Sequence, residues 1–325
     1  MKKRYFRIAI GLGIVLSLGF SYLESSAQEK FPSKPIKVIV AYNPGGGTDL
    51  WVRTMQEKAE QVLGQRLILE YKPGLAGAVA LSYIRNEKPD GYTIVAYVNS
   101  GIVRNPHFVK VPYNALEDFT FINCLVWAPH ALTSPIDAPW NTLEEFINYA
   151  RGQKEGVNYA LQSIGSSAHL AMELLSRQAK IKLNHVVFKG GGEATTALLG
   201  GHLKMAVISN QGEYVRAKKL KLIAFIDLEG HKGFPEILTM KKLGYDIDIR
   251  VWYGFIGPKG MPKEIVEILD NAFYQATLDK NVVQKLQHQL DLTTTHITGQ
   301  ALINQIAEEY KANGEIIRSI GLKKE

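Results

Sequence analysis

Residues 36–63 read IKVIVAYNPGGGTDLWVRTMQEKAEQVL, and this stretch decides the fold. Apart from Lys37, its first seven residues are apolar and rich in β-branched side chains, which predicts a buried strand. Three glycines follow, and apolar side chains then recur at helical spacing from Asp49 to Leu63, where Gly64 supplies a stop. A strand that passes through a glycine turn into a helix is the opening of an α/β unit.

Strands and helices alternate in two parts of the chain. The pattern predicts one α/β unit at the start, a second from about residue 141, and a helical tail. Extended runs at 121–127 and 247–256 are the expected crossings between the units. The expected strands are 67–71, 92–98, 157–161, 185–188, 205–209 and 220–226, and the expected helices include one ending at 85, one from 143 to 150, one starting at Ser166, and 193–199, 263–278 and 300–320.

Composition is that of a globular protein. The 325 residues are 46% hydrophobic and 21% charged, which excludes a disordered, collagen-like or disulfide-stapled chain. The net charge of +7 is partly local, because residues 1–27 hold four basic side chains and one acidic one, leaving 34 and 30 in the remainder. These remaining cations form no stripe interleaved with aromatic residues, so no nucleic-acid partner is expected.

The first 27 residues have the pattern of a secretory signal peptide. A basic start is followed by the apolar run 8–20 and by Ser25-Ser26-Ala27, a site for cleavage after Ala27. The alternative of a membrane anchor needs roughly 20 apolar residues, more than this run supplies. The only cysteine, Cys124, lies in the apolar run FINCLVW, so we expect a buried thiol, no disulfide and no lipid anchor at the cleavage site.

The turn 43–49, NPGGGTD, is the first candidate binding site. Glycines let a ligand approach the backbone N–H groups, and the following helix directs its positive dipole end to the same place, so the turn suits an anion. The alternative is a simple turn in which Thr48 or Asp49 caps the helix. Nucleotides fit poorly, because no Gly-Lys pair completes a P-loop and Leu50 occupies the third glycine position of the dinucleotide fingerprint.

Two further turns have the same character. Residues 163–169, SIGSSAH, run from an expected strand into a helix, and residues 189–193, KGGGE, precede another helix. A hydrolase would use Ser166 or Ser163 with His169 as base, but no G-x-S-x-G motif is present, and His169 could equally be structural. The histidines show no H-x-x-x-H spacing and one cysteine cannot form a thiolate site, so no metal is expected.

The chain resembles the solute receptors of tripartite tricarboxylate transporters, the Bug receptor family. The matching stretches follow the family's order over nearly all of the chain after the signal peptide: FPSKPIKVIVAYNPGGGTDLWVR, LGQRLILEYKPGLAGA, KPDGYTI, SIGSSAHLAMELL, VVFKGGGEATTALLGGHL and WYGFIGPKGMPKEIVEIL. Departures include Phe188, where tyrosine is commoner, and Lys204, where aspartate is usual, and they concern the identity of the ligand rather than the fold.

The resemblance implies an α/β protein with the two-lobed, type II periplasmic-binding-protein fold, or Venus flytrap, in which each lobe is a mainly parallel sheet flanked by helices. Residues 28–126 with 250–325 would form the first lobe and residues 127–249 the second. The protein would be periplasmic and would hold a small organic carboxylate between the lobes. The implied ligand-binding residues are Asn43, Gly46, Gly47, Thr48, Asp49, Asn99, Ser100, Ser163, Gly165, Ser166, His169, Lys189 and Gly190.

The resemblance also implies a function without covalent chemistry or a cofactor. The carboxylate could be a di- or tricarboxylate or an aromatic or amino acid, and the receptor would deliver it to membrane permease subunits as a monomer. Two alternatives remain, a secreted serine hydrolase and a receptor that reports to a sensor kinase instead of a permease.

Overall fold

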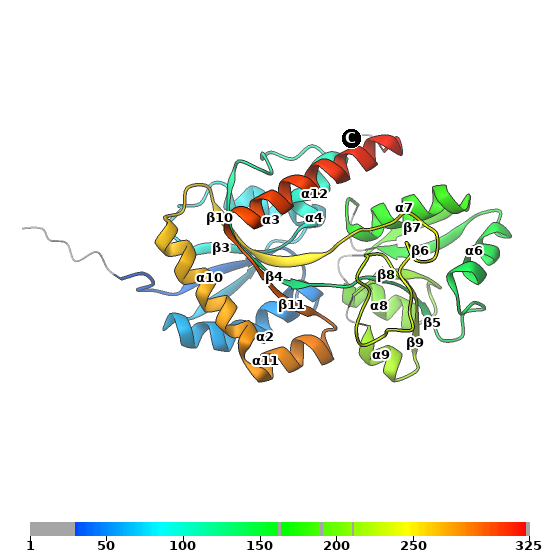
Figure 1. Cartoon of the computed structure of the whole chain (residues 1–325), viewed down its shortest axis with the longest axis horizontal. Helices are drawn as coiled ribbons and strands as arrows, with labels where there is room; N and C mark the ends of the chain where they lie inside the picture. The colour runs from blue at the N-terminus through cyan, green and yellow to red at the C-terminus, as the bar shows by residue number, and fades with distance from the viewer. Residues whose placement is uncertain (1–29, 162–163, 189–190, 210, 323–325) are drawn as a thin grey trace, which may run out of the picture. The chain divides into compact units, whose positions relative to one another are not determined.

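The computed structural model describes residues 30–161, 164–188, 191–209 and 211–322. The predicted signal peptide and three of the predicted site residues, Ser163, Lys189 and Gly190, lie outside the described residues. Residues 34–325 form one unit that contains every described strand and helix. Its strands make two sheets, joined by the segments that follow β4 and precede β10 (Figure 1).

The first sheet has six strands in the order β11-β4-β10-β3-β1-β2. β1 pairs in parallel with both β2 and β3, whereas β10 runs antiparallel to β3 and β4, and β11 antiparallel to β4. The strands are β1 (Ile36–Val40), β2 (Leu67–Tyr71), β3 (Thr93–Val98), β4 (Phe119–Trp127), β10 (Trp252–Pro258) and β11 (Thr293–Ile297).

The second sheet has five strands in the order β7-β6-β8-β5-β9. β6 is parallel to β7 and β8, and β5 is antiparallel to β8 and β9. The strands are β5 (Ala131–Pro135), β6 (Val157–Leu161), β7 (Leu183–Val187), β8 (Ala206–Ile208) and β9 (Leu220–Phe225).

Both sheets are therefore mixed, and the expected parallel arrangement describes only β1–β3 and β6–β8. The reason lies in the crossings. β4 carries the chain out of the first sheet and its neighbour β10 brings the chain back, so the two run in opposite directions. The expected crossing at 121–127 is confirmed as part of β4, while the return strand begins only at Trp252.

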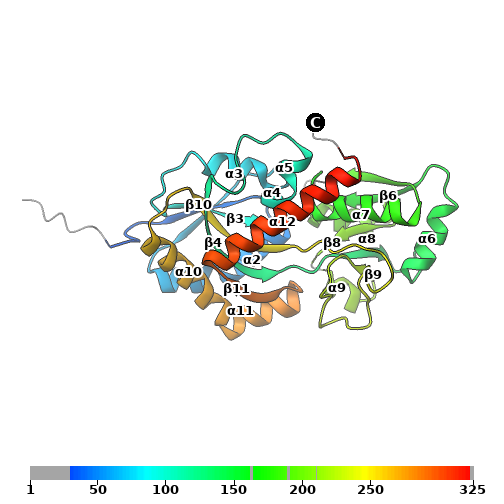
Figure 2. The ribbon, with the colours of Figure 1, turned by 45° about the horizontal axis from the view of Figure 1, so that its top comes forward.

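Helices cover the sheets. α10 packs on α2 beside the first sheet, and α12 packs on α4 and β4. In both views α12 extends from the first sheet towards the helices of the second (Figures 1 and 2). The helices are α2 (Gly47–Leu63), η1 (Leu75–Gly77), α3 (Ala78–Ile84), α4 (Ser100–Val103), α5 (Asn105–Phe108), α6 (Leu143–Arg151), α7 (Ser167–Ala179), α8 (Gly191–Leu199), α9 (Gly212–Arg216), α10 (Lys263–Leu278), α11 (Lys280–Gln284), the π-helical turn η2 (Lys285–Gln289) and α12 (Gly299–Ser319).

Each sheet has its own core. Trp51, Trp252 and Cys124 are fully buried about the first sheet, and the burial of Cys124 confirms the expected buried thiol. The core of the second sheet also includes Ile317 and Ile320 from the end of the chain. The predicted lobe boundaries at 126/127 and 249/250 stay a prediction. Within the described residues, no helix has the length and apolar character needed to cross a membrane.

The topology sets where the loops meet. β1 and β3 are parallel neighbours, so the turns that follow them lie at the same edge of the first sheet. The turn after β6 leads into α7 of the second sheet. Ligands of open α/β sheets bind beyond the carboxyl ends of such strands.

Candidate functional site

A small cavity of about 20 Å³ lies between loops of the two sheets. The first sheet contributes the starts of α2 and α4, and the second contributes the starts of α7 and α8. The predicted glycine turn, residues 43–49, and the predicted serine turn, residues 163–169, therefore contribute Gly46 and Ser166 to one crevice. Its lining residues are Tyr42, Gly46, Gly47, Thr48, Val98, Ser100, His130, Ser166, Ser167, Gly191, Val251 and Tyr253.

The glycine turn is held in shape by Asp49. One carboxylate oxygen accepts a hydrogen bond from the Gly45 backbone N–H at 2.8 Å, and the other accepts from Arg53 Nε at 2.8 Å and from the Tyr71 hydroxyl at 2.7 Å. Gly45 has φ of 79°, a left-handed conformation that glycine adopts without strain. The carboxylate is 4% exposed and does not line the cavity, so its role here is to fix the turn.

The alternative in which Thr48 or Asp49 caps α2 is wrong. The helix begins at Gly47, its N-cap is Gly46, and no side chain accepts a hydrogen bond there. Thr48 and Asp49 both fall inside the first turn of the helix, too late for the N-cap position. The first N–H groups of α2 consequently have no side-chain partner at the cap, which is the arrangement that suits an anionic ligand.

The serine turn has a different internal structure. Ser166 is the N-cap of α7, and its hydroxyl oxygen accepts from the His169 backbone N–H at 3.3 Å. The Gly165 N–H donates to His169 Nδ1 at 3.2 Å. Burial, and to a smaller extent the neighbouring His185, together lower the pKa of His169 to about 4, so the ring is neutral at pH 7.

His169 lies behind the cavity rather than in its wall. Its side chain is 7% exposed, and Nδ1 is occupied by the Gly165 N–H. The hydrogen bond between Ser166 and His169 runs from the histidine backbone to the serine oxygen, not from the hydroxyl to the ring. The geometry of a serine nucleophile activated by a histidine base is therefore not the one that these two residues adopt.

Asn99 and Ser100 differ in their position. Asn99 is fully buried, donates to Arg250 O at 3.1 Å and Glu309 Oε2 at 3.0 Å, and accepts from Arg104 Nη2 at 2.8 Å. These bonds use the amide, so Asn99 supports the cleft from behind. Ser100 lines the cavity and accepts from Arg104 Nη2 at 2.9 Å, which leaves its hydroxyl hydrogen for a ligand.

Arg104 places a buried positive charge behind Ser100. The side chain is 1% exposed, and burial lowers the pKa of its guanidinium to about 10, so it stays charged at pH 7. The Glu309 carboxylate offsets part of this charge, and the guanidinium orients Ser100 at the cavity wall through its hydrogen bond.

A larger cavity of about 600 Å³ shares Gly46 with the small one. Its walls again come from both sheets, with the glycine turn on one side and α8 on the other. Phe188, one of the departures from the family pattern, faces it. The remaining lining residues are Asn43, Pro44, Gly45, Gly192, Glu193, Thr196, Ala197 and His202.

Sequence reasoning missed His130 and Tyr253, which both line the small cavity. His130 Nδ1 bonds Ala128 O at 2.9 Å, and burial lowers its pKa to about 4, so this ring is also neutral. Burial raises the pKa of Tyr253 to about 12. Both residues lie in or next to the segments that connect the sheets. The predicted crossings at 121–127 and 247–256 are the sequence signal that could have pointed to them.

Two α/β units with a shared cleft between their helix N-termini define a two-lobed solute-binding protein. The family model of the tripartite tricarboxylate transporter family receptor, TctC, matches residues 51–322. The chain therefore belongs to this family, as its sequence motifs indicate. The family and the fold are those of periplasmic solute-binding proteins.

Individual proteins agree with this assignment. A curated relative from Cupriavidus necator, the UPF0065 protein in gbd 5'region, is 31% identical over 100% of this chain and 99% of its own length. The periplasmic binding protein BugD has a TM-score of 0.84 and 24% identity, covering 91% of this chain and 100% of its own. MatC from Rhodopseudomonas palustris with bound malate has a TM-score of 0.79 and 25% identity, covering 88% of this chain and 100% of its own.

Proposed function

We propose that this receptor is exported to the periplasm, closes over a small organic carboxylate and delivers it to a membrane permease of the tripartite tricarboxylate type. The observation that carries the proposal is the small cavity, where Gly46 and Gly47 of one lobe face Ser166 and Ser167 of the other. A carboxylate placed there accepts hydrogen bonds from both lobes at once. It therefore binds the closed conformation more tightly than an open one, and binding drives closure.

The donors on the two sides are of the kind that hold an anion. The first N–H groups of α2 and α7 are main-chain donors at helix N-termini, and Thr48, Ser100 and Ser167 add hydroxyl groups. Gly165, although not in the wall, carries φ of 79° and sets the direction in which the chain enters α7. Asp49, Asn99 and His169 act behind these donors by fixing their positions.

The remainder of the ligand would occupy the larger cavity. At about 20 Å³ the small cavity has room for the oxygens of one carboxylate, while the adjoining space of about 600 Å³ suits a substituent. Asn43 and Phe188 in its walls would contribute to selectivity. The malate bound to MatC, a relative at 25% identity, supports a small carboxylic acid as the ligand class.

The receptor performs no covalent chemistry in this proposal, because Ser166 and His169 are engaged with backbone groups. Delivery to a sensor kinase is the second route by which a closed receptor could act. A carboxylate panel cannot separate these two routes, whereas co-purification with permease or kinase subunits does.

The test begins with native mass spectrometry of protein purified directly from cells, which identifies a bound acid by its mass. Thermal stabilisation is then measured with malate, adipate and that acid. The variant Gly46→Val places a side chain in the cavity wall, where a Cβ meets Asn43 O at 3.3 Å, and is expected to abolish the stabilisation.

Gly152→Val is the matched control. Its Cβ meets a backbone oxygen at a similar 3.4 Å, but Gly152 follows α6 away from both cavities. Stabilisation lost in Gly46→Val and kept in Gly152→Val supports the site. Unchanged affinity in a folded Gly46→Val protein refutes it, and turnover of chromogenic esters that Ser166→Ala abolishes would favour the hydrolase.

A further inference from the structure

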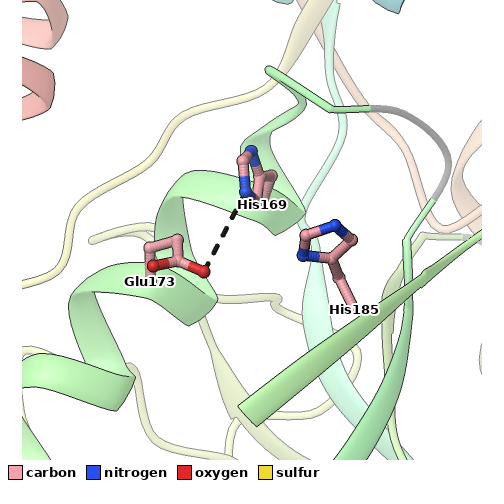
Figure 3. Close-up of side chains that lie close together, drawn as sticks. All are labelled: His169, Glu173 and His185. Carbon is pink, nitrogen blue, oxygen red and sulfur yellow. Dashed lines mark ion pairs between the residues drawn. The ribbon is translucent and has the colours of Figure 1, made fainter. Parts of the chain in front are cut away.

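Three side chains with metal-ligating atoms meet beside α7, outside the cavity described above (Figure 3). His169 and Glu173 lie one turn apart on the helix, and His185 extends towards them from β7. One ligand atom from each residue lies within 4.8 Å of the other two. The expectation of no metal site rested on spacing along the chain, which misses a cluster completed by a neighbouring strand.

The side chains of His169, Glu173 and His185 do not hydrogen-bond to one another. His169 Nε2 and Glu173 Oε1 are 4.0 Å apart, too far for a hydrogen bond. The rings of His169 and His185 meet edge to face, with centroids 5.3 Å apart. Within the described part of the chain, neither Glu173 nor His185 makes a side-chain hydrogen bond, so both are available to a ligand.

We propose that His169 Nε2, Glu173 and His185 bind a divalent transition-metal ion, with Zn²⁺ as its representative. Two imidazoles and a carboxylate form a borderline ligand set that suits Zn²⁺, Co²⁺ and Ni²⁺ and disfavours Mg²⁺. Metal–ligand bonds of about 2.0–2.2 Å bring ligand atoms closer together than 4.8 Å, so a modest rotation of the side chains closes the site.

Access and coordination number agree with this assignment. His185 is exposed and the Glu173 side chain is 24% exposed, so an ion can enter from solvent. The buried His169 lies at the base of the site with its side chain 7% exposed. Three protein ligands leave a fourth position for water in a tetrahedral site.

The site is coupled to the serine turn through the second nitrogen of His169. Nδ1 now accepts from the Gly165 N–H at 3.2 Å, which places the proton of the neutral ring on Nε2. A metal on Nε2 requires the other tautomer, with the proton on Nδ1 facing the Gly165 N–H. Metal binding therefore exchanges one backbone hydrogen bond for coordinate bonds and moves the turn that leads to Ser166.

Isothermal titration calorimetry of the tag-free protein with Zn²⁺ tests the site, and titration with Mg²⁺ is the negative control. We expect one equivalent of Zn²⁺ to bind and Mg²⁺ not to bind. His185→Gln and Glu173→Gln should each weaken Zn²⁺ binding at least about tenfold, because each removes a ligand. His288→Gln is the matched control, since His288 is exposed and its side chain makes no hydrogen bond within the part of the chain that the structure describes.

Amide NMR spectra test the coupling. Zn²⁺ should shift the Gly165 amide resonance in the wild type and in His288→Gln but not in His185→Gln. Failure of wild-type protein to bind Zn²⁺, or equal binding by the His185 and Glu173 variants, overturns the metal site. Tight binding without a Gly165 shift overturns the coupling. Neither readout depends on the carboxylate, so failure of the proposed transport function would leave this test intact.

Discussion

Replacing Gly212 by alanine should weaken carboxylate binding without destabilising either lobe. Gly212, at the start of α9 in the second lobe, donates its N–H to Asp291 Oδ2 at 2.6 Å. Asp291 lies between η2 and β11 in the first lobe, so this bond joins the two lobes. A Cβ on Gly212 would lie 2.2 Å from Asp291 Oδ1, so the carboxylate must move away and its hydrogen bond to the Gly212 N–H is lost.

The size of the effect follows from this one contact. The Asp291 side chain is 7% exposed, and a hydrogen bond to a buried charged group contributes about 1.5–3 kcal/mol. Arg216 Nη2, 3.5 Å from Asp291 Oδ1, is on a side chain that is 47% exposed and adds at most a few tenths of a kcal/mol after screening by solvent. Because about 1.4 kcal/mol is a factor of ten, affinity should fall about 10- to 100-fold.

Calorimetric titration with the acid identified by native mass spectrometry measures the affinity, and urea unfolding checks that α9 tolerates alanine, a good helix former. Asp291→Ala and the double variant complete a cycle. Once Asp291 is removed, Gly212→Ala should cost little, so the two changes should not add. Full additivity, or wild-type affinity in Gly212→Ala, would show that this contact does not hold the lobes together.

Three further changes test other parts of the molecule. Asp49→Asn should lower the free energy of unfolding by about 1–3 kcal/mol in urea, because one amide cannot accept from both Gly45 and the opposite donors. Burial raises the pKa of Asp227 from 3.8 to about 6, so the folded protein keeps a proton that the unfolded chain loses in that window. Stability therefore falls by about 2 kcal/mol as the pH rises from about 4 to 6. Urea titrations of wild type and Asp227→Asn should differ by that slope, and equal slopes would contradict the raised pKa. Gly165→Ala should cost about 1–2 kcal/mol in thermal unfolding, because φ is 79° and a Cβ would lie 2.7 Å from Asn105 Oδ1, and an unaffected melting temperature would contradict this.

Elements with strong local patterns could be predicted from sequence alone. The strands Leu67–Tyr71 and Val157–Leu161 and the helix Lys263–Leu278 have the predicted bounds, because apolar spacing and neighbouring Pro and Gly residues mark their ends. β5, Ala131–Pro135, was missed. It is short and contains buried Thr133 and Ser134, and it becomes a strand because it pairs with β8 and β9 on both sides.

Sequence also predicted some features of the candidate site and missed others. Gly46 and Ser166 could be placed at one cleft because each follows a strand and begins a helix. The roles of Asp49 and Asn99 could not be predicted, because they depend on Tyr71 and Glu309, which are distant in the sequence. His185 joins His169 only through the position of β7 beside α7, which no local pattern encodes.

The C-terminal helix α12 limits how the receptor can move. Near its middle, Glu309 accepts hydrogen bonds from Trp252 Nε1 and Asn99 at about 3.0 Å in the first lobe. At its end, Ile317 is 1% exposed in the core of the second. A helix anchored in both lobes resists bending, because bending strains its own backbone hydrogen bonds. Rotation of the lobes about its long axis leaves those bonds intact. We therefore expect the two lobes to open by rotating about the axis of α12 rather than by bending away from it.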